Sequence, residues 1–396
     1  MAEQFLKNCW YVAAQDHEVA RMQALRRLIL NEPVVMYRKR DGSAVALEDR
    51  CAHRQAPLSK GQVRGDNIQC PYHGMRYGPD GKCVLIPSQD SVPDTARVKA
   101  YPVVERHKWI WIWIGDPALA DPDLIEDFHW RDDPGWQSKG ELLPLKANYR
   151  LLVENLCDLT HVPFIHPTSL NETMIDRNEQ APVKTTRDGS SVTVERWEFD
   201  QPAPSYFRAM AGMKRADRVD RWLNLVYTPA SFVRLDIGAA PAGQGAQDGD
   251  RSAFPTVRNM NAITPETDKT THYFWAQAHD FRTDEPWITD LLVANVHEAF
   301  LEDLEIIALQ QENIDSGTTP PVITPSTSGV VWLSFSVISS AMRSTPRAIV
   351  AASARQRAPA RTRSSSSLVT CLLIVLLQGK ASGAIARELE CRAPAA

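Results

Sequence analysis

The sequence lacks an apolar segment long enough to cross a membrane. Its longest apolar run, Leu368–Leu377, has ten residues, whereas a membrane-spanning helix needs about 20. The first twenty residues contain no basic stretch followed by an apolar one, so no secretory signal is predicted. We therefore expect a cytoplasmic protein with no membrane contact.

The chain also lacks a strong excess of either charge. Charged residues make up 23% of the sequence and the formal net charge is −4, which argues against a protein that binds nucleic acid through bulk charge. No glycine-rich fingerprint for NAD or flavin is evident. If the chain catalyses redox chemistry, its electrons must come from another protein.

Cysteine is scarce, with seven residues scattered along 396 positions. An odd and scattered set does not suit a disulfide framework and fits a reducing compartment better. Two of the seven, Cys51 and Cys70, fall in a metal-ligand pattern. Reduced thiols would therefore serve a function at these two positions.

The chain divides by composition into three parts, which we expect at residues 1–116, 117–318 and 319–396. The first part reads as a small all-β module, with short strands at Val34–Tyr37, Ala44–Leu47 and Ile110–Ile114 separated by Gly, Asp and Pro turns. The second part reads as an α+β domain in which an antiparallel sheet precedes a long C-terminal helix. Its predicted strands are Val192–Phe199, Trp222–Tyr227 and His272–Ala278, and its predicted helix is Ile288–Gln311.

The third part, residues 319–396, differs from the rest. It holds nine basic and only two acidic residues, and its Ala/Arg/Ser-rich stretch has no steady period, as in disordered segments. We interpret it as a poorly ordered tail, either an out-of-frame extension or unselected sequence.

Two short loops each offer one cysteine and one histidine. The first reads Cys51-x-His53 and the second, after sixteen intervening residues, reads Cys70-x-x-His73. Two such loops can hold a two-iron cluster from opposite sides, with the thiolates on one iron and the imidazoles on the other. This ligand set raises the reduction potential to roughly −150 to +300 mV, against about −400 mV for an all-cysteine plant-type cluster. The spacing therefore predicts a [2Fe–2S] cluster.

A zinc ion is the alternative, because two cysteines and two histidines also suit a structural zinc site. Glycine and proline crowd both loops, and a β module surrounds them. That setting favours the cluster over zinc. The flanking residues are Pro57, Gly61, Pro71 and Gly74.

A second set of candidate ligands lies downstream, in Asp158-x-x-His161 and His166. We expect a helix over Leu151–His161, after which Pro163 turns the chain so that His166 comes back towards His161. Two imidazoles and one carboxylate form a facial triad that leaves one side of an Fe(II) ion open. The motif alone is weak, since a histidine in such a segment is more often a hydrogen-bonded core residue. The upstream cluster favours iron, because it moves single electrons and needs an acceptor.

The third ligand of that iron must come from elsewhere in the chain. Glu302, Asp303 and Glu305 lie together on the predicted C-terminal helix. Three carboxylates in four residues are by default a solvated acidic face. The sequence of this segment alone does not decide whether one of these carboxylates is a metal ligand or all three are solvated.

The loop sequences CAHRQAP and CPYHG resemble those of Rieske iron–sulfur proteins. Respiratory members carry two further cysteines that cross-link the loops, and the matching positions here are Ala56 and Tyr72. The chain therefore resembles the oxygenase branch. The segments NCWYVAA, VERHKWIWIWIGDP and NLCDLTHVPFIHP resemble the subgroup that contains the oxygenase component of vanillate O-demethylase, over roughly residues 5–313.

The resemblance implies an N-terminal all-β Rieske domain followed by an α+β catalytic domain. It implies that the mononuclear iron is held by His161, His166 and Asp303, with Glu302 as the second choice for the carboxylate. It also implies that Asp158 is an electron-transfer bridge, which joins His73 of one subunit to His161 of its neighbour in a homotrimer. The alternative for Asp158 is an ordinary residue on a helix surface.

The activity that the resemblance implies is oxidation of a methoxy or methyl group on an aromatic acid. For a vanillate-like methyl ether, the product loses formaldehyde. The resemblance further implies O₂ as co-substrate and NADH as electron source, through a separate flavin/iron–sulfur reductase. The sequence does not separate pocket residues from structural ones among Arg150, Trp222, Asn224, Arg234 and Trp275.

Two other functions remain open. One is ring hydroxylation of a different aromatic acid by the same kind of iron site. The other, from a different class, is a Rieske electron-transfer protein without chemistry of its own. Such carriers are about the size of the first domain, and the additional two hundred residues with a plausible triad argue against that class.

Overall fold

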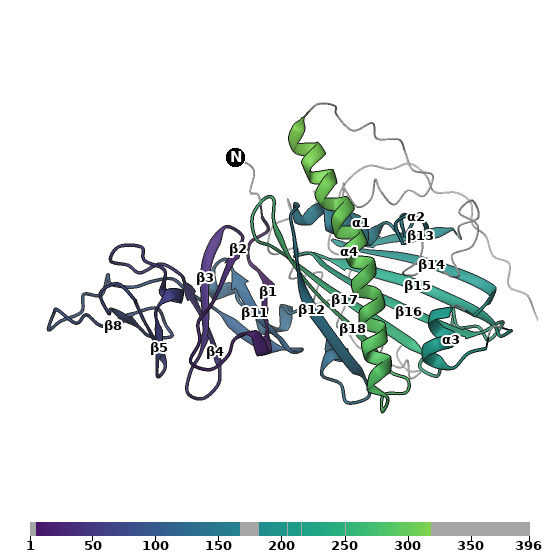
Figure 1. Ribbon diagram of the computed structural model, residues 1–396, viewed down its shortest axis with the longest axis horizontal. Helices are drawn as coiled ribbons and strands as arrows, with labels where there is room; N and C mark the ends of the chain where they lie inside the picture. Colours follow the sequence, from purple (N-terminus) through teal and green to yellow (C-terminus); the bar gives the residue numbers. More distant parts are fainter. Residues whose placement is uncertain (1–4, 167–181, 204, 215, 250, 318–396) are drawn as a thin grey trace, which may run out of the picture. The chain divides into compact units, whose positions relative to one another are not determined.

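The computed structural model describes residues 5–166, 182–203, 205–214, 216–249 and 251–317 (Figure 1). The predicted tail over residues 319–396, with its apolar run, lies outside these ranges. Among the described helices, none combines the length and the apolar character that crossing a membrane requires.

The N-terminal part is built from antiparallel sheets of short strands, as the sequence predicts. In its described residues the strand orders are β1-β11-β10, β2-β3-β4-β9 and β5-β6-β7-β8. The predicted strands Val34–Tyr37, Ala44–Leu47 and Ile110–Ile114 are confirmed within β3, β4 and β11. The bounds are β1 Cys9–Gln15, β2 Leu25–Ile29, β3 Glu32–Arg38, β4 Ala44–Glu48, β5 Gln62–Arg64, β6 Asn67–Gln69, β7 Arg76–Tyr77, β8 Cys83–Leu85, β9 Ala100–Tyr101, β10 Val103–Arg106 and β11 Trp109–Ile114.

Strand β11 is the centre of the first of these sheets, between β1 and β10. Every residue of its WIWIWI sequence is buried, which explains why it shows no alternation of apolar and polar residues. A strand covered on both faces reads as a continuous apolar run. Short 3₁₀ turns connect these elements at Asp16–Glu18, Leu58–Lys60, Pro117–Leu119, Pro122–Leu124 and His129–Arg131.

The second part contains an antiparallel sheet with the order β12-β18-β17-β16-β15-β14-β13. The predicted strands Val192–Phe199, Trp222–Tyr227 and His272–Ala278 are confirmed within β14, β15 and β18. The bounds are β12 Gln137–Leu145, β13 Val183–Asp188, β14 Ser191–Pro202, β15 Arg218–Thr228, β16 Phe232–Pro241, β17 Thr256–Pro265 and β18 Thr271–His279.

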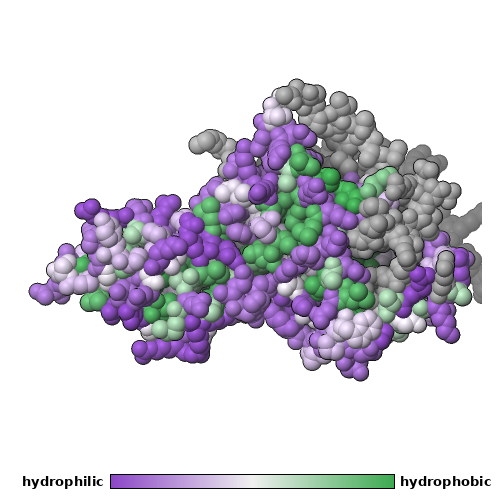
Figure 2. Space-filling model, in the orientation of Figure 1, coloured by the Kyte–Doolittle hydropathy of each residue, from purple (hydrophilic) through white to green (hydrophobic). Residues whose placement is uncertain are grey.

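The predicted C-terminal helix is confirmed as α4, Pro286–Ser316, which packs against β12 and β18 (Figure 1). Gly317 ends it in the left-handed conformation, at φ 64°, which a glycine adopts without steric cost. Figure 2 shows hydrophobic residues gathered over this helix. Its exposed large apolar side chains are Trp287, Leu301, Ile306, Leu309 and Ile314.

The predicted helix over Leu151–His161 is too long. The structure has α1 at Tyr149–Cys157, started by the Asn148 side chain, and a separate short α2 at Val162–Ile165. The sequence predicts that Pro163 turns the chain after that helix, whereas Pro163 stands in the first turn of α2, where a missing N–H costs nothing. The third helix, α3, spans Ser205–Ala211.

The two faces of the large sheet have different neighbours. Asn261 and Trp275 are paired across β17 and β18 and lie on the face towards α4, where the Trp275 ring centroid is 5.0 Å from that of Phe300. Phe232 of β16 lies on the opposite face, 5.5 Å from the Trp111 ring of β11. The helices α1 and α4 therefore share one side of the sheet, and the N-terminal part packs on the other.

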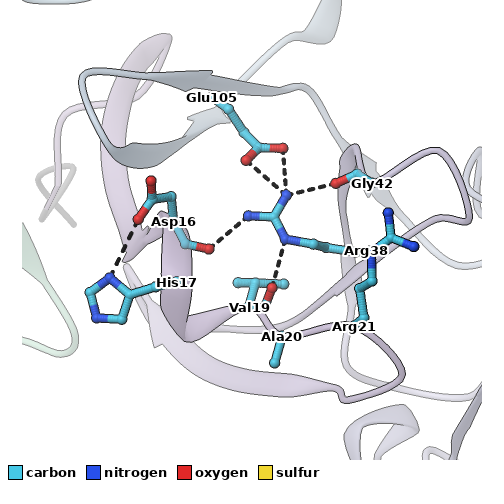
Figure 3. A pocket seen from close by; sticks show the side chains of 8 residues that line it. All are labelled: Asp16, His17, Val19, Ala20, Arg21, Arg38, Gly42 and Glu105. Atoms are coloured by element: carbon cyan, nitrogen blue, oxygen red, sulfur yellow. Dashed lines mark hydrogen bonds and ion pairs between the residues drawn. The ribbon is translucent and has the colours of Figure 1, made fainter. Parts of the chain in front are cut away.

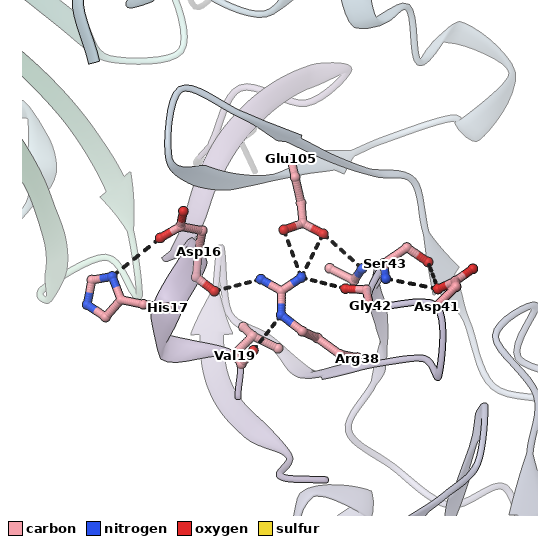
Figure 4. Close-up of polar contacts among 9 residues, drawn as sticks. Asp16, His17, Val19, Arg38, Asp41, Gly42, Ser43 and Glu105 are labelled. Carbon is pink, nitrogen blue, oxygen red and sulfur yellow. Dashed lines mark hydrogen bonds and ion pairs between the residues drawn. The ribbon is translucent and has the colours of Figure 1, made fainter. Parts of the chain in front are cut away.

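A polar pocket of about 460 Å³ surrounds Arg38 in the N-terminal part (Figure 3). The guanidinium donates from Nε to the Val19 carbonyl, from Nη2 to the Asp16 carbonyl, and from Nη1 to the Gly42 carbonyl, each at 2.7 Å. Nη1 also meets both carboxylate oxygens of Glu105, at 2.8 and 2.9 Å (Figure 4). All three nitrogens are occupied, so Arg38 ties strands together and is not a free anion site.

Candidate metal centres

The cysteines and histidines of the two N-terminal loops divide by burial. Cys51 and Cys70 are buried, whereas His53 and His73 are exposed, with ring centroids 4.8 Å apart. The structure therefore places both thiols on the inner side and both imidazoles on the outer side. This is the arrangement that a cluster with one thiolate-bound and one imidazole-bound iron requires.

Backbone hydrogen bonds close each loop. The Cys51 N–H donates to the Ala56 carbonyl at 2.8 Å, and the Cys70 N–H donates to the Met75 carbonyl at the same distance. Gly74, at φ 74°, completes the second turn, and a Cβ there would stand 3.1 Å from Pro87. The loops are thus fixed by the chain itself, which holds the four donors in place.

The four donors suit two irons better than one zinc ion. The ligand atoms of a site for a single ion lie close together, as those of His161, His166 and Asp303 do. Among the described residues, no three of Cys51, His53, Cys70 and His73 converge in that way. Burial raises the pKa of the Cys70 thiol and so favours its protonated form. A bound metal reverses this, because a coordinating thiol is deprotonated. The five described cysteines are all free, and the loops carry no cross-link.

Tyr77 is a residue of this site that the sequence reasoning missed. Its hydroxyl lies 3.1 Å from Cys51 Sγ and accepts a hydrogen bond from the Ala52 N–H, also at 3.1 Å. The hydroxyl has a single hydrogen, and Cys51 Sγ at 3.1 Å is a nearer acceptor for it than Met75 Sδ at 3.8 Å. A hydrogen bond to a cluster thiolate is one of the levers that set its potential.

The second set of candidate ligands is brought together by three separate elements. His161 follows α1, His166 follows α2 and Asp303 comes from α4, and their ligand atoms all lie within 4.8 Å of one another. His161 Nε2 is 3.5 Å from Asp303 Oδ1, and His166 Nε2 is 3.3 Å from Asp303 Oδ2. We call these three residues the triad. Their donor set, two imidazoles and one carboxylate, fits a mononuclear iron.

The other ring nitrogens of the triad have their own partners. His166 Nδ1 lies 2.7 Å from Glu302 Oε2, and His161 Nδ1 meets the backbone carbonyl of Asp158. An acceptor at Nδ1 fixes the tautomer that leaves Nε2 free to bind metal. Glu302, the second choice for the carboxylate ligand, thus contacts the far side of His166.

Burial acts in the same direction on the pKa of both histidines, whereas the nearby carboxylates offset it to different extents. Burial lowers the pKa of His161, and the nearby Asp303 carboxylate only partly offsets it. Burial also lowers the pKa of His166, but its contacts with Asp303 and Glu302 outweigh that effect and raise it above the usual value. His161 is therefore the more readily neutral ligand, and His166 is the one at which metal competes with a proton.

Asn155 is a second residue that the sequence reasoning missed. It lies on α1, and its Nδ2 donates to Asp303 Oδ1 at 2.9 Å. Its Oδ1 is buried and has no hydrogen-bond partner. Buried polar atoms are nearly always paired, so this oxygen can accept a hydrogen bond from one more donor next to Asp303.

Asp158 lies beside the triad, at the C-terminal cap of α1. Its side chain is turned towards Thr160, whose N–H and hydroxyl both donate to Oδ1, at 2.9 and 2.5 Å. Within one chain, Asp158 therefore reaches His161 through its backbone carbonyl. Its bridging role between subunits stays a prediction.

Comparison with known proteins finds matches over both parts of the chain. Residues 9–102 match the family model described as Rieske [2Fe-2S] domain, and residues 145–329 match the vanillate O-demethylase oxygenase C-terminal domain. The toluene-4-sulfonate monooxygenase system iron-sulfur subunit of Comamonas testosteroni is 38% identical, over 81% of this chain and 92% of that protein. The chain belongs to the Rieske oxygenase family.

A second relative of this Rieske oxygenase is a vanillate O-demethylase oxygenase subunit from Pseudomonas sp. (strain HR199 / DSM 7063). It is 39% identical, over 78% of this chain and 87% of that protein. The crystal structure of dicamba monooxygenase bound to dicamba matches with a TM-score of 0.76 and 31% identity, over 86% of this chain and 98% of that one. Another structure of that enzyme contains non-heme iron.

These matches confirm the predicted fold class, an all-β Rieske domain followed by a catalytic domain with an antiparallel sheet and a C-terminal helix. They also confirm the predicted cofactors, a [2Fe–2S] cluster and a mononuclear iron. The protein is a monooxygenase-type oxidoreductase, the oxygenase component of its system. The predicted division at residues 116 and 318 is not tested by the matches and stays a prediction.

Proposed function

We propose that this Rieske oxygenase removes a methyl group from a methoxylated aromatic acid of the vanillate type, with release of formaldehyde. The observation that carries the proposal is the convergence of His161, His166 and Asp303 in a chain that also presents the cluster loops. The relatives that act on vanillate and dicamba support the choice of a methoxy group.

On this proposal, Cys51, His53, Cys70 and His73 bind the [2Fe–2S] cluster, and the triad binds the mononuclear iron. The bound iron supplies a Lewis-acidic, redox-active centre at which O₂ is activated beside the substrate. The residues around it hold the ligands in place. Glu302 and the Asp158 carbonyl orient the two imidazoles, and Asn155 holds the Asp303 carboxylate.

We further propose that electrons come from NADH through a separate flavin/iron–sulfur reductase. The relatives are named as oxygenase components or subunits of larger systems, which supports a separate partner. A homotrimer in the cytoplasm is the assembly we propose. The exposure of His53 and His73 supports it, because a cluster edge at the surface is open to a neighbouring subunit.

The test is oxygen uptake by the iron-loaded chain with a flavin/iron–sulfur reductase and NADH, across methoxylated and methylated aromatic acids. We expect NADH-dependent uptake with methoxylated acids, and one formaldehyde for each substrate consumed. Uptake that yields a ring-hydroxylated product without formaldehyde would replace demethylation by ring hydroxylation.

Iron content separates the oxygenase from a simple electron carrier. Three irons per chain are expected, two in the cluster and one in the triad. Two irons per chain, with no oxygen uptake on any aromatic acid, would show a carrier instead.

A further inference from the structure

Three buried polar atoms without hydrogen-bond partners lie on neighbouring positions of the large sheet. They are Asn259 Nδ2 on β17, and Trp275 Nε1 and Gln277 Oε1 on β18. Asn259 pairs directly with Gln277 in the sheet register, and Trp275 is two residues before Gln277 on the same face. All three side chains are at most 2% exposed. Buried polar groups are nearly always paired, so three orphans on adjoining positions require an explanation.

A chain of hydrogen bonds fixes which atom of Asn259 is left free. The Tyr273 hydroxyl donates to Asn261 Oδ1 at 2.6 Å, so Asn261 must present Nδ2 on its other side. Asn261 Nδ2 donates to the Val233 carbonyl and to Asn259 Oδ1, at 2.9 and 2.6 Å. Asn259 Oδ1 is therefore an acceptor in use, and its Nδ2 is a donor without an acceptor. The orientation follows from the network.

These orphans lie on the face of the sheet that carries the metal site. Helix α1, which holds Asn155, packs on β16 and β17, and α4, which holds Asp303, packs on β18. Phe300, one helical turn before Asp303, lies 5.0 Å from the Trp275 ring. The three polar atoms thus belong to the layer between the sheet and the helices that bear the triad.

The three atoms are two donors and one acceptor. Indole Nε1 is only a donor, Asn259 Nδ2 is a donor by the network, and the unpaired atom of Gln277, in the orientation that its amide has in the structure, is the acceptor Oε1. A hydroxyl group has one donor hydrogen and two acceptor lone pairs, which is the complement of this set. None of the three side chains carries a charge, so the set does not supply a counter-ion for a carboxylate.

We propose that Asn259, Trp275 and Gln277 form a subsite for a hydroxyl group on the aromatic ring of the substrate. The substrate class is then a phenol that also bears the methoxy or methyl group to be oxidised. The Asn259 amide and the Trp275 indole donate to the phenol oxygen, and the phenol O–H donates to Gln277 Oε1. This inference deepens the proposed function and rests on it.

The direct test measures binding of three matched acids to the iron-loaded wild-type protein by calorimetry, under anaerobic conditions and without reductase. Vanillate has the hydroxyl, 3,4-dimethoxybenzoate keeps the oxygen but lacks its hydrogen, and 3-methoxybenzoate lacks both. We expect vanillate to bind about tenfold more tightly than either analogue, the size of one or two buried hydrogen bonds. Equal dissociation constants for all three would overturn the proposal and indicate that water satisfies these atoms.

A variant of Gln277 separates recognition of the substrate hydroxyl from a role of this side chain in packing. Gln277→Met keeps the length of the side chain and removes the acceptor, and we expect it to weaken vanillate binding about tenfold. Binding of 3-methoxybenzoate should change less than twofold. Gln137→Met makes the same substitution at an exposed position of β12 and should leave both constants unchanged. An equal loss for both acids in Gln277→Met would show a structural role and overturn the proposal.

If Gln277→Met does not fold, Asn259→Asp provides the second variant. It keeps the oxygen that accepts from Asn261 and removes the free N–H. The same selective loss of vanillate binding is expected. Formaldehyde release separates the two proposals. Hydroxyl-dependent binding without formaldehyde would refute demethylation alone, whereas formaldehyde from acids that bind equally well would refute the subsite alone.

Discussion

His166 is held between two consecutive residues of α4. Its Nε2 lies 3.3 Å from Asp303 Oδ2, and its Nδ1 lies 2.7 Å from Glu302 Oε2. The two carboxylates contact opposite nitrogens of one imidazole ring, so they have different roles. Asp303 faces the position where the two imidazoles meet, and Glu302 sets the orientation of the ring. A carboxylate behind a metal-binding histidine also raises the basicity of that ligand.

Replacing Glu302 tests whether this residue orients His166 and is not itself a ligand. Glu302→Gln keeps an oxygen acceptor and removes the charge, so we expect the triad to bind iron about tenfold to a hundredfold more weakly, as for other changes behind a ligand. Chelator competition monitored by iron content measures the affinity. Glu305→Gln changes an exposed glutamate on the same helix and should bind iron normally. If Glu302→Gln abolishes iron binding as completely as loss of Asp303 does, Glu302 is itself a ligand.

Asp303→Ala removes the carboxylate of the triad. We expect the cluster absorption spectrum to stay intact, because the proposed cluster ligands lie in a different domain, while the mononuclear iron and turnover are lost. Iron analysis should fall from three to two per chain. Turnover that persists in this variant would show that the carboxylate ligand lies elsewhere.

Asp158→Asn addresses the bridging role. The amide oxygen can still accept from Thr160, and the backbone carbonyl that meets His161 is unchanged. Both metals should therefore load normally. Rapid-mixing experiments on the reduced protein should show that transfer of an electron from cluster to iron is blocked in a single turnover. Normal transfer would leave Asp158 with only its local role at the end of α1.

The parts of the site that could be predicted from sequence are those carried by local spacing. Cys51 and His53 share one loop, and Cys70 and His73 share another, so their pattern is visible along the chain. Asp303 is different, because only the packing of α4 brings it to the histidines. Composition could not separate it from an exposed acidic face, and the resemblance to a family was needed.

Tyr77 and Asn155 could not be found from sequence for a further reason. Each acts through a single atom whose partner is chosen by packing, and neither belongs to a spaced motif. The helix over Leu151–His161 was predicted too long because apolar spacing continues past Cys157, while Asp158 turns the chain out of the helix. Of the residues that the sequence left undecided, only Trp275 lies on the sheet face towards α4. Trp222, Asn224 and Arg234 occupy the opposite face by register.

Tyr77→Phe tests the hydrogen bond to Cys51 Sγ, the proposed cluster thiolate. A donor to sulfur stabilises the reduced cluster more than the oxidised one, because the reduced cluster carries more negative charge. Its removal should lower the midpoint potential by about 40 mV, the one-electron equivalent of about 1 kcal/mol. Spectroelectrochemical titration measures the shift. Tyr37→Phe changes another buried tyrosine of this domain, whose hydroxyl bonds to the Asp66 carbonyl, and should leave the potential unchanged. A potential that does not move in Tyr77→Phe would show that the hydroxyl does not reach the sulfur.

Glu154 of α1 should make the stability of the fold depend on pH. Burial raises the pKa of its carboxyl from 4.5 to about 7, and the nearby Arg150 offsets only part of that effect. The folded state therefore keeps a proton that the unfolded chain releases between pH 4.5 and 7, so the free energy of unfolding falls as pH rises through that window.

Glu154→Gln removes this dependence, because its amide stays neutral at every pH. At pH 8 the variant should exceed the wild type in unfolding free energy by at most about 3 kcal/mol, and at pH 4 the two should agree closely. Urea denaturation at both pH values measures the difference. Glu312→Gln, at an exposed position of α4, provides the control and should show no such pH-dependent gain. A gain of equal size at pH 4 and pH 8 would mean that packing, and not the proton, separates Glu154→Gln from the wild type.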